Sequence, residues 1–240
     1  MAVKVTAVCL VYLLRRVSDL LRWEYKNSSF KLPWKQQTLP IFSENSPFYH
    51  TLQQPTPLTA EEEQDLKLAH KRLMSICEKS FESNVPVVID VEDTSIQPAI
   101  DYMTYWASIK YNEPQRAILY GTIQAYLKDA GDRMALTKKA GDKMGLPLGF
   151  KFVRGDYMSS ERKLAQSLGV ESPIHDTIDD AHNCYNGSAR YMLDQVSSGP
   201  GGIILATHNL DSEHGIMLRI GTGLEKLSSR TYAMKVASRP

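Results

Sequence analysis

The chain has 240 residues, of which 42% are hydrophobic, enough for a substantial core in one large domain or two small ones. Its 28 Lys and Arg residues nearly balance 27 Asp and Glu residues, and a net charge of +1 gives no indication of nucleic-acid binding. The cysteines Cys9, Cys77 and Cys184 are widely spaced, which excludes the usual metal-ligand spacings and suits free thiols in a reducing compartment.

The N-terminal region is predicted to form a buried strand and then a helix. Val3–Cys9 is largely apolar, and leucine and valine recur at helical spacing from Leu13 to Leu21. The run Val5–Leu14 also has the character of the hydrophobic part of a targeting signal. It is too short to span a bilayer and no small-residue cleavage site follows it, so we prefer the interpretation as a strand and a helix.

Residues 28–58 are predicted to form a long irregular insertion. Prolines interrupt the segment throughout, and aromatic residues such as Trp34 and Phe42 are scattered along it. Because large aromatic side chains favour burial, we expect the segment to pack against the domain rather than to act as a flexible linker. A helix follows, and Thr59 and Glu62 have the spacing of a capping box at its start.

From residue 85 onward, apolar strands alternate with helices. This pattern predicts a parallel sheet covered on both faces, with polar residues collected at the carboxyl ends of its strands, where such folds carry their sites. No Gly-x-Gly-x-x-Gly segment follows any strand, so the dinucleotide-binding fingerprint is missing. The predicted strands are Val85–Val91, Ala117–Gln124, Leu148–Val153 and Ile203–Ala206, and the predicted helices are about 97–110, 129–144, 159–168 and 177–195.

The segment Gly149–Arg162 is the most informative part of the chain. A short apolar run ends at Arg154 and Gly155, a polar turn follows, and a helix then begins. Glycine allows the backbone to approach a ligand closely, and the first turn of a helix offers free N–H groups. The layout therefore suits a phosphate or a flat polar ring.

Four motifs, in this order along the chain, resemble proline dehydrogenase, the flavin-dependent proline oxidase of mitochondria and bacteria. They are Asp90–Thr94, Thr122–Lys128, Val153–Arg162 and Leu205–Asn209. The resemblance extends over residues 2 to 209, and its N-terminal part is similar to the plant-type branch. It implies an α/β fold, an incomplete (βα)8 TIM-type barrel with about five or six strands present. Residues 1–209 are expected to form this partial barrel, with an irregular insertion at 28–58. A divergent tail is expected at 210–240.

The resemblance also implies a reaction. Members of the family bind FAD at the carboxyl ends of the barrel strands and oxidise L-proline to 1-pyrroline-5-carboxylate. The hydride passes to flavin N5, and the electrons continue to a quinone in the membrane. A mitochondrial location is expected on the same basis. A flavin barrel of the methylenetetrahydrofolate reductase type is the alternative enzyme, and the motifs at Val153–Arg162 and Leu205–Asn209 argue against it.

Three residues are expected on the reactive side of the flavin by this resemblance. Lys151 matches the basic residue beside N5, for which many members carry Arg; a surface lysine is the alternative, although an unpaired charge inside an apolar strand is costly. Asp90 matches a carboxylate near the substrate, and its alternative is an N-terminal cap for the following helix. Lys4 matches the lysine that attracts the proline carboxylate.

Other residues are expected to hold the cofactor. Gln124 matches a glutamine at the polar edge of the flavin, with a satisfied core amide as the alternative. Val91 matches a backbone contact to the flavin. Thr207 and His208 match residues near the ribose and phosphate, where a purely structural histidine is the alternative.

The turn after the strand at Leu148–Val153 is expected to contact FAD through Val153, Arg154, Gly155 and Asp156. For Arg154 the alternative is a solvated turn residue. Most members have alanine in place of Asp156, and a carboxylate close to the flavin phosphates would repel them unless it were neutralised.

The resemblance also indicates what this stretch of sequence lacks. The family barrel has one strand before residue 2 and two more after Asn209, and its last helix carries paired arginines that grip the proline carboxylate. The chain ends at Pro240 without that motif, so an inactive fragment that acts as a binding or regulatory partner is the second hypothesis. No metal site is predicted, because His175, His182 and His208 do not have metal-ligand spacing.

Overall fold

The computed structural model describes residues 1–212, 214–215 and 232–235, and its centre is a parallel sheet of six strands. Each strand pairs with the next one along the chain, from β1 to β6, as in a βα barrel. Among the described strands no pairing joins β6 to β1, so the sheet is open. The strands are β1 (Ala2–Val3), β2 (Val87–Ile89), β3 (Leu119–Gln124), β4 (Gly149–Val153), β5 (Gly202–Ala206) and β6 (Tyr232–Lys235).

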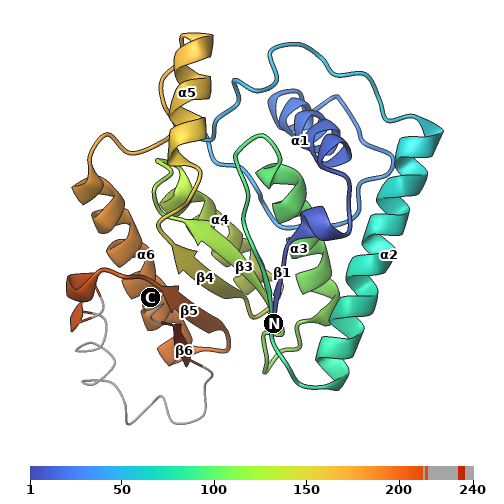
Figure 1. The fold of residues 1–240 in the computed structure, drawn as a ribbon. Coiled ribbons are helices and arrows are strands. Elements are labelled where there is room, and N and C mark those ends of the chain that lie inside the picture. Colours follow the sequence, from blue (N-terminus) through green and yellow to red (C-terminus); the bar gives the residue numbers. More distant parts are fainter. Residues whose placement is uncertain (213, 216–231, 236–240) are drawn as a thin grey trace.

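Helices connect the strands and pack around the outside of the sheet (Figure 1). The prediction of an α/β fold with an incomplete barrel is confirmed. The capping box is present as well: Thr59 accepts from the Glu62 backbone N–H, and the Glu62 side chain accepts from the Thr59 N–H. The helical elements are η1 (Val5–Ala7), α1 (Val11–Lys26), α2 (Ala60–Glu82), α3 (Gln97–Tyr111), α4 (Ala130–Lys143), α5 (Met158–Leu168) and α6 (Ile178–Ser198).

The prediction of a strand over Val3–Cys9 was wrong beyond Val3. The chain turns there into the short helix η1, because the Cys9 N–H donates to the Val5 carbonyl at 2.9 Å rather than to a neighbouring strand. Val5 and Cys9 are nonetheless buried. The apolar pattern therefore indicates that these residues are buried, and it does not indicate that they pair with a neighbouring strand.

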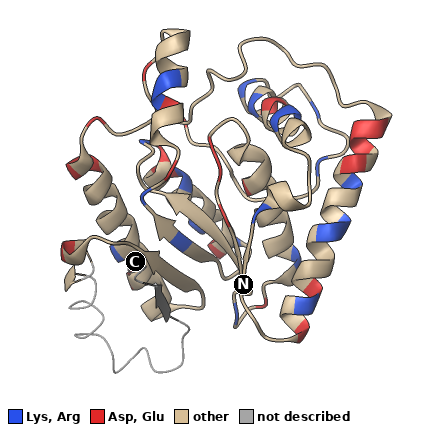
Figure 2. Ribbon diagram, viewed as in Figure 1, with Lys and Arg blue, Asp and Glu red and all other residues tan. Residues whose placement is uncertain are grey.

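The two faces of the sheet differ, which corrects the prediction that helices cover both. Residues facing outward along β4, such as Phe150 and Phe152, are fully buried against the helical layer. Lys151 and Val153, which alternate with them, face the opposite side and are only partly buried. In Figure 2 charges of both signs are spread over the helices, while most of the sheet is uncharged.

Tyr120 closes the base of this inner face. It is aligned with Gly149 on β4, and Gly149 is aligned with Gly202 on β5. A Cβ atom would lie 2.5 Å from the Tyr120 side chain at Gly149 and 2.0 Å from it at Gly202. The two glycines thus allow one aromatic side chain to lie across three strands.

The irregular segment 28–58 packs on the helical layer, as predicted. Phe42 and Phe48 contact the Tyr25 ring at 5.3 and 5.2 Å between centroids. The Ser46 hydroxyl donates to Asp129 Oδ2 at 2.6 Å, which ties the segment to the start of α4. None of the helices in the described part of the chain combines the length and apolarity needed to cross a membrane. Most of the predicted tail 210–240 lies outside the described residues, and its residues 232–235 form β6.

Candidate functional site

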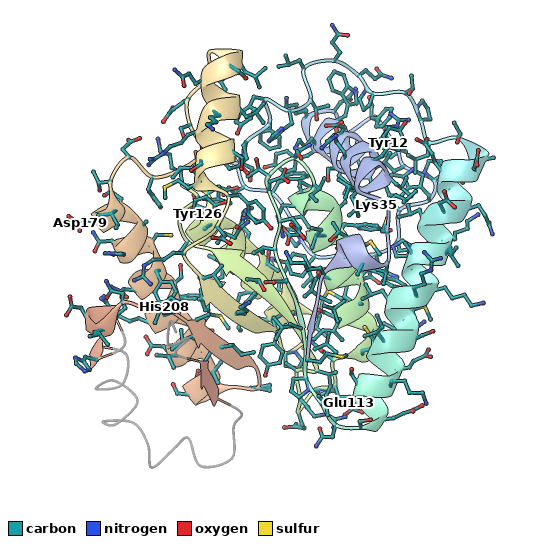
Figure 3. All side chains as sticks on the ribbon, viewed as in Figure 1. Tyr12, Lys35, Glu113, Tyr126, Asp179 and His208 are labelled. Atoms are coloured by element: carbon teal, nitrogen blue, oxygen red, sulfur yellow. The ribbon has the colours of Figure 1, made fainter. Side chains whose placement is uncertain are left out.

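A cleft of about 1010 Å³ opens on the inner face at the carboxyl ends of the strands. Figure 3 places His208, one of its lining residues, just past the end of β5. Every predicted site residue except Gln124 lines this one cleft. These residues are Lys4, Asp90, Val91, Lys151, Val153, Arg154, Gly155, Asp156, Thr207 and His208.

Lys151 and Asp90 form an ion pair inside the cleft. The Lys151 Nζ lies 3.1 Å from Asp90 Oδ1, and the side chains are 21% and 28% exposed. The alternative role for Asp90, an N-terminal cap, is not what the structure shows, because Ile96 occupies the N-cap position of α3. A partly buried cation held beside a carboxylate is thus present on the inner face.

A second cluster surrounds Glu92, which the sequence analysis did not identify. Lys4 donates to Glu92 Oε1 at 3.0 Å, Tyr157 donates to Oε2 at 2.5 Å, and Thr6 donates to Oε1 at 3.2 Å. Burial acts to raise the pKa of Glu92, but the hydrogen bonds from Tyr157 and Lys4 prevail and hold it below its usual value. The same bond to Glu92 raises the pKa of Lys4. Both groups are therefore charged at neutral pH.

Arg154 is anchored and is not a solvated turn residue. Its guanidinium donates to His182 Nδ1 at 2.8 Å, to Thr207 Oγ1 at 2.5 Å and to Ser212 Oγ at 2.8 Å. It also lies over the Tyr185 ring, 4.4 Å from the centroid. His182 and Ser212 had no local signal in the sequence, because they come from α6 and from the segment after β5 and meet Arg154 only in space.

Gly155 has a backbone conformation that side chains rarely adopt, with φ of +130°. A Cβ atom at this position would lie 1.6 Å from the Tyr126 ring, which is 4% exposed and lies below the turn. Figure 3 shows Tyr126 near the base of α5. The neighbouring Asp156 is exposed at the cleft margin, so water screens its charge there.

Gln124 is 1% exposed at the end of β3, and its amide is only half satisfied. Its Nε2 donates to the Glu92 carbonyl at 2.9 Å, while Oε1 is buried and has no partner among the described residues. The alternative of a fully satisfied core amide therefore does not match the structure. Val153 uses its carbonyl within the fold, where it accepts the Ala125 N–H at 2.8 Å. Val91 is 8% exposed.

The residues of the cleft fit a large, flat ligand that carries negative charge. The volume is at the upper end of the range for ligand pockets. The lining holds three cations, Lys4, Lys151 and Arg154, against the carboxylates Asp90 and Asp156, together with the close-approach glycine Gly155. The unpaired Oε1 of Gln124 is buried at the end of β3, outside the lining of the cleft. Within the described ranges, no group of three or more His, Cys, Asp or Glu residues is placed to hold a metal ion.

The sequence of the chain is similar to known proteins of one family. The family model for proline dehydrogenase matches residues 12–234. Proline dehydrogenase 2, mitochondrial, from Arabidopsis thaliana is 58% identical over 212 residues, which cover 88% of this chain and 44% of that protein. Human hydroxyproline dehydrogenase is 31% identical over 159 residues, covering 65% of this chain and 35% of the relative. The chain thus spans less than half the length of the curated relatives it matches.

Solved structures show the same fold. Proline utilization A (PutA) from Bdellovibrio bacteriovorus, crystallised after inactivation by N-propargylglycine, aligns with a TM-score of 0.59 at 22% identity. The alignment covers 72% of this chain and 18% of that one. A second PutA structure, with proline bound in remote sites, aligns with a TM-score of 0.58 at 16% identity.

Proposed function

This chain belongs to the proline dehydrogenase family, and from that premise we propose that it serves the FAD-dependent oxidation of L-proline to 1-pyrroline-5-carboxylate. The observation that carries the proposal is the Lys151–Asp90 ion pair in the cleft, with the unpaired Gln124 oxygen buried at the end of β3, the strand between theirs. Residues 1–209 are the part that bears the site. The mitochondrial names of the plant relatives support a mitochondrial location.

When bound, FAD would supply the acceptor for the hydride, and the electrons would continue to a membrane quinone. Lys151 would place a positive charge beside the part of the isoalloxazine ring that gains negative charge, and Asp90 holds that ammonium in place. Gln124 Oε1, which is buried without a partner among the described residues, would offer an acceptor to the polar edge of the ring. Arg154 and Thr207, which are hydrogen-bonded to each other, would hold the phosphates of the cofactor. His208 and Gly155 would contact it beside them, and Val91 and Val153 would be neighbouring contacts.

Lys4 is assigned to the carboxylate of the substrate. Its side chain is 49% exposed while the ammonium contacts Glu92. The ammonium has three N–H donors, so a proline carboxylate that reaches Lys4 would share it with Glu92, whose negative charge would oppose the second carboxylate. Tyr157 holds the second Glu92 oxygen and keeps that carboxylate from rotating.

Anaerobic titration of the purified chain tests the proposal. We expect a bound flavin whose visible absorbance bleaches when L-proline is added, with D-proline as a matched control that leaves the spectrum unchanged. Bleaching by trans-4-hydroxy-L-proline in place of L-proline would redirect the substrate assignment to the hydroxylated amino acid. A bound flavin that neither amino acid reduces would contradict the proposed reaction, and a chain that binds no flavin would contradict the cofactor assignment.

A further inference from the structure

A buried hydrogen-bond cluster lies behind the cleft and is centred on Thr94, in the loop between β2 and α3. Glu161 of α5, 2% exposed, accepts the Thr94 backbone N–H at Oε1 and the Thr94 hydroxyl at Oε2, both at 2.6 Å. On the other side, His50 Nε2 lies 2.7 Å from Thr94 Oγ1. The same loop carries Asp90 and Val91 into the cleft.

Further hydrogen bonds hold the backbone of the loop. Arg22, a fully buried residue of α1, donates to the Thr94 carbonyl and to the Ser95 carbonyl. Nearer the cleft, Gln124 donates to the Glu92 carbonyl at 2.9 Å. Thr94 is therefore contacted from α1, from the irregular segment and from α5.

The position of Glu161 matters because of the sheet order. β2 and β4 are not neighbours, since β3 lies between them, so strand pairing does not directly fix the distance between the loops that follow them. Glu161 belongs to α5, the helix that begins directly after the Arg154–Tyr157 turn, and it reaches the loop after β2. It spans the gap between the two segments that line the cleft.

The hydrogen bonds have a single possible direction when Glu161 is ionised. A carboxylate only accepts, so the one Thr94 hydroxyl proton is donated to Glu161. The Thr94 oxygen must then accept from His50, which places the His50 proton on Nε2. Burial lowers the pKa of His50 to about 3, so the ring is neutral and carries one proton at neutral pH. Burial raises the pKa of Glu161, and the two bonds from Thr94 oppose that rise.

We propose that Glu161 is a positioning residue of this site, which holds the Asp90–Thr94 loop in register with the turn at Arg154 and Gly155. His50 extends the connection, so the irregular segment 28–58 supports the cleft from behind. The inference rests on the proposed function for the identity of the ligand that the two loops contact. The direction of the hydrogen bonds is independent of any ligand.

Replacing the carboxylate by an amide gives a sharp test of that direction. In E161Q the carbonyl oxygen must face the Thr94 backbone N–H, because a backbone N–H only donates. The amide nitrogen then donates to the Thr94 hydroxyl, the hydroxyl turns toward His50, and the His50 proton moves to Nδ1. We therefore predict that E161Q reverses the tautomer of His50, which lies 111 residues away in sequence, because the hydrogen bonds through Thr94 connect the two side chains.

The experiment uses the full chain labelled with ¹⁵N-histidine, and three measurements are made on each variant. The tautomer of His50 is read from its ring nitrogen shifts, the exchange of the amides of residues 90–94 is followed, and FAD is titrated. The variants are E161Q, T94V and T104V. Thr104 is 1% exposed and its hydroxyl donates to Ile100 within α3, so T104V removes a buried hydroxyl without touching the loop.

We expect Nε2–H in the unaltered chain, Nδ1–H in E161Q and near-normal FAD affinity in E161Q. T94V should accelerate amide exchange over 90–94 and weaken FAD binding by about tenfold or more, the size of a lost bond to a buried charge. T104V should lower the melting temperature and leave exchange and FAD affinity unchanged.

An unchanged tautomer in E161Q, or amide exchange in T94V like that in T104V, would overturn the inference. If the unaltered chain bound no FAD, the proposed function would fail, while the tautomer and the exchange rates would still decide the role of Glu161.

Discussion

The two faces of the sheet have different roles, even within a single strand: one packs against the helices and the other lines the cleft. Along β4, Phe150 and Phe152 are fully buried on the helical side, while Lys151 and Val153 line the cleft on the other. Because side chains alternate in a strand, one five-residue segment supplies both. The outer face should therefore tolerate little change without unfolding, and the inner face should tolerate change with loss of function.

The largest effect is expected on the outer face, from F152A. Truncating a fully buried phenylalanine removes its burial energy and leaves a cavity, at a cost of about 3–5 kcal/mol. Urea denaturation followed by circular dichroism measures the loss. K151M in the same strand is the control and should change stability far less. A loss under about 1 kcal/mol for F152A would contradict the division between the faces.

On the turn at the cleft, G155A should weaken FAD binding roughly 10- to 100-fold, about 1.4–2.7 kcal/mol. The added Cβ meets the Tyr126 ring at 1.6 Å and the φ of +130° disfavours it, so the turn must move. Fluorescence titration gives the affinity. Gly145 also has a positive φ but open space around it, so G145A separates backbone strain from the clash. Equal affinities in the two variants would contradict the role of the turn.

The helical layer should also determine part of the pH dependence of stability. Burial lowers the pKa of His70, on α2, from 6.5 to about 4. A depressed histidine pKa means that the unfolded chain binds more protons between these values, so stability is full above pH 6.5 and falls as the pH drops toward 4. Between pH 7 and 5 the free energy of unfolding should fall by about 1–2 kcal/mol because of His70. H70F should remove this part of the pH dependence. If the free energy of unfolding of H70F had the same pH dependence as that of the unaltered chain, the contribution of His70 would be contradicted.

The smallest effect on stability is expected at the Lys4–Glu92 pair. Lys4 is half exposed, and exposed pairs contribute about 0–1 kcal/mol, so K4M should barely change the unfolding free energy. The proline concentration needed for half-maximal flavin reduction should rise, since Lys4 is assigned to the substrate carboxylate. A large loss of stability with unchanged proline dependence would make the pair structural.

Much of the frame was predictable because local patterns determine it. The apolar strands, the capping box at Thr59 and the burial of Trp34 all follow from side chains whose requirements are met nearby. The strand predicted over Val3–Cys9 was wrong past Val3, since continuous apolar character indicates burial without specifying which backbone partners are available.

The sequence predicted which residues lie at the strand ends that form the site, and it did not predict which of them contact one another. Lys151 and Asp90 were each expected in the site, yet their pairing depends on two strands separated by β3. Glu92 and His182 were missed because their partners, Tyr157 and Arg154, are more than 25 residues away along the chain. Contacts of this kind are set by sheet order, which no local spacing records.

The reduction potential of the bound flavin in K151M tests the central claim most directly. Methionine keeps the unbranched stem of Lys151 and removes its charge, so changes in packing are small. If the ammonium stabilises the negative charge of the reduced flavin, its loss should make the potential more negative by about 30 mV or more, equivalent to about 1.4 kcal/mol for two electrons. A potential equal to that of the unaltered chain, with FAD still bound, would contradict the placement of Lys151 beside the reacting ring.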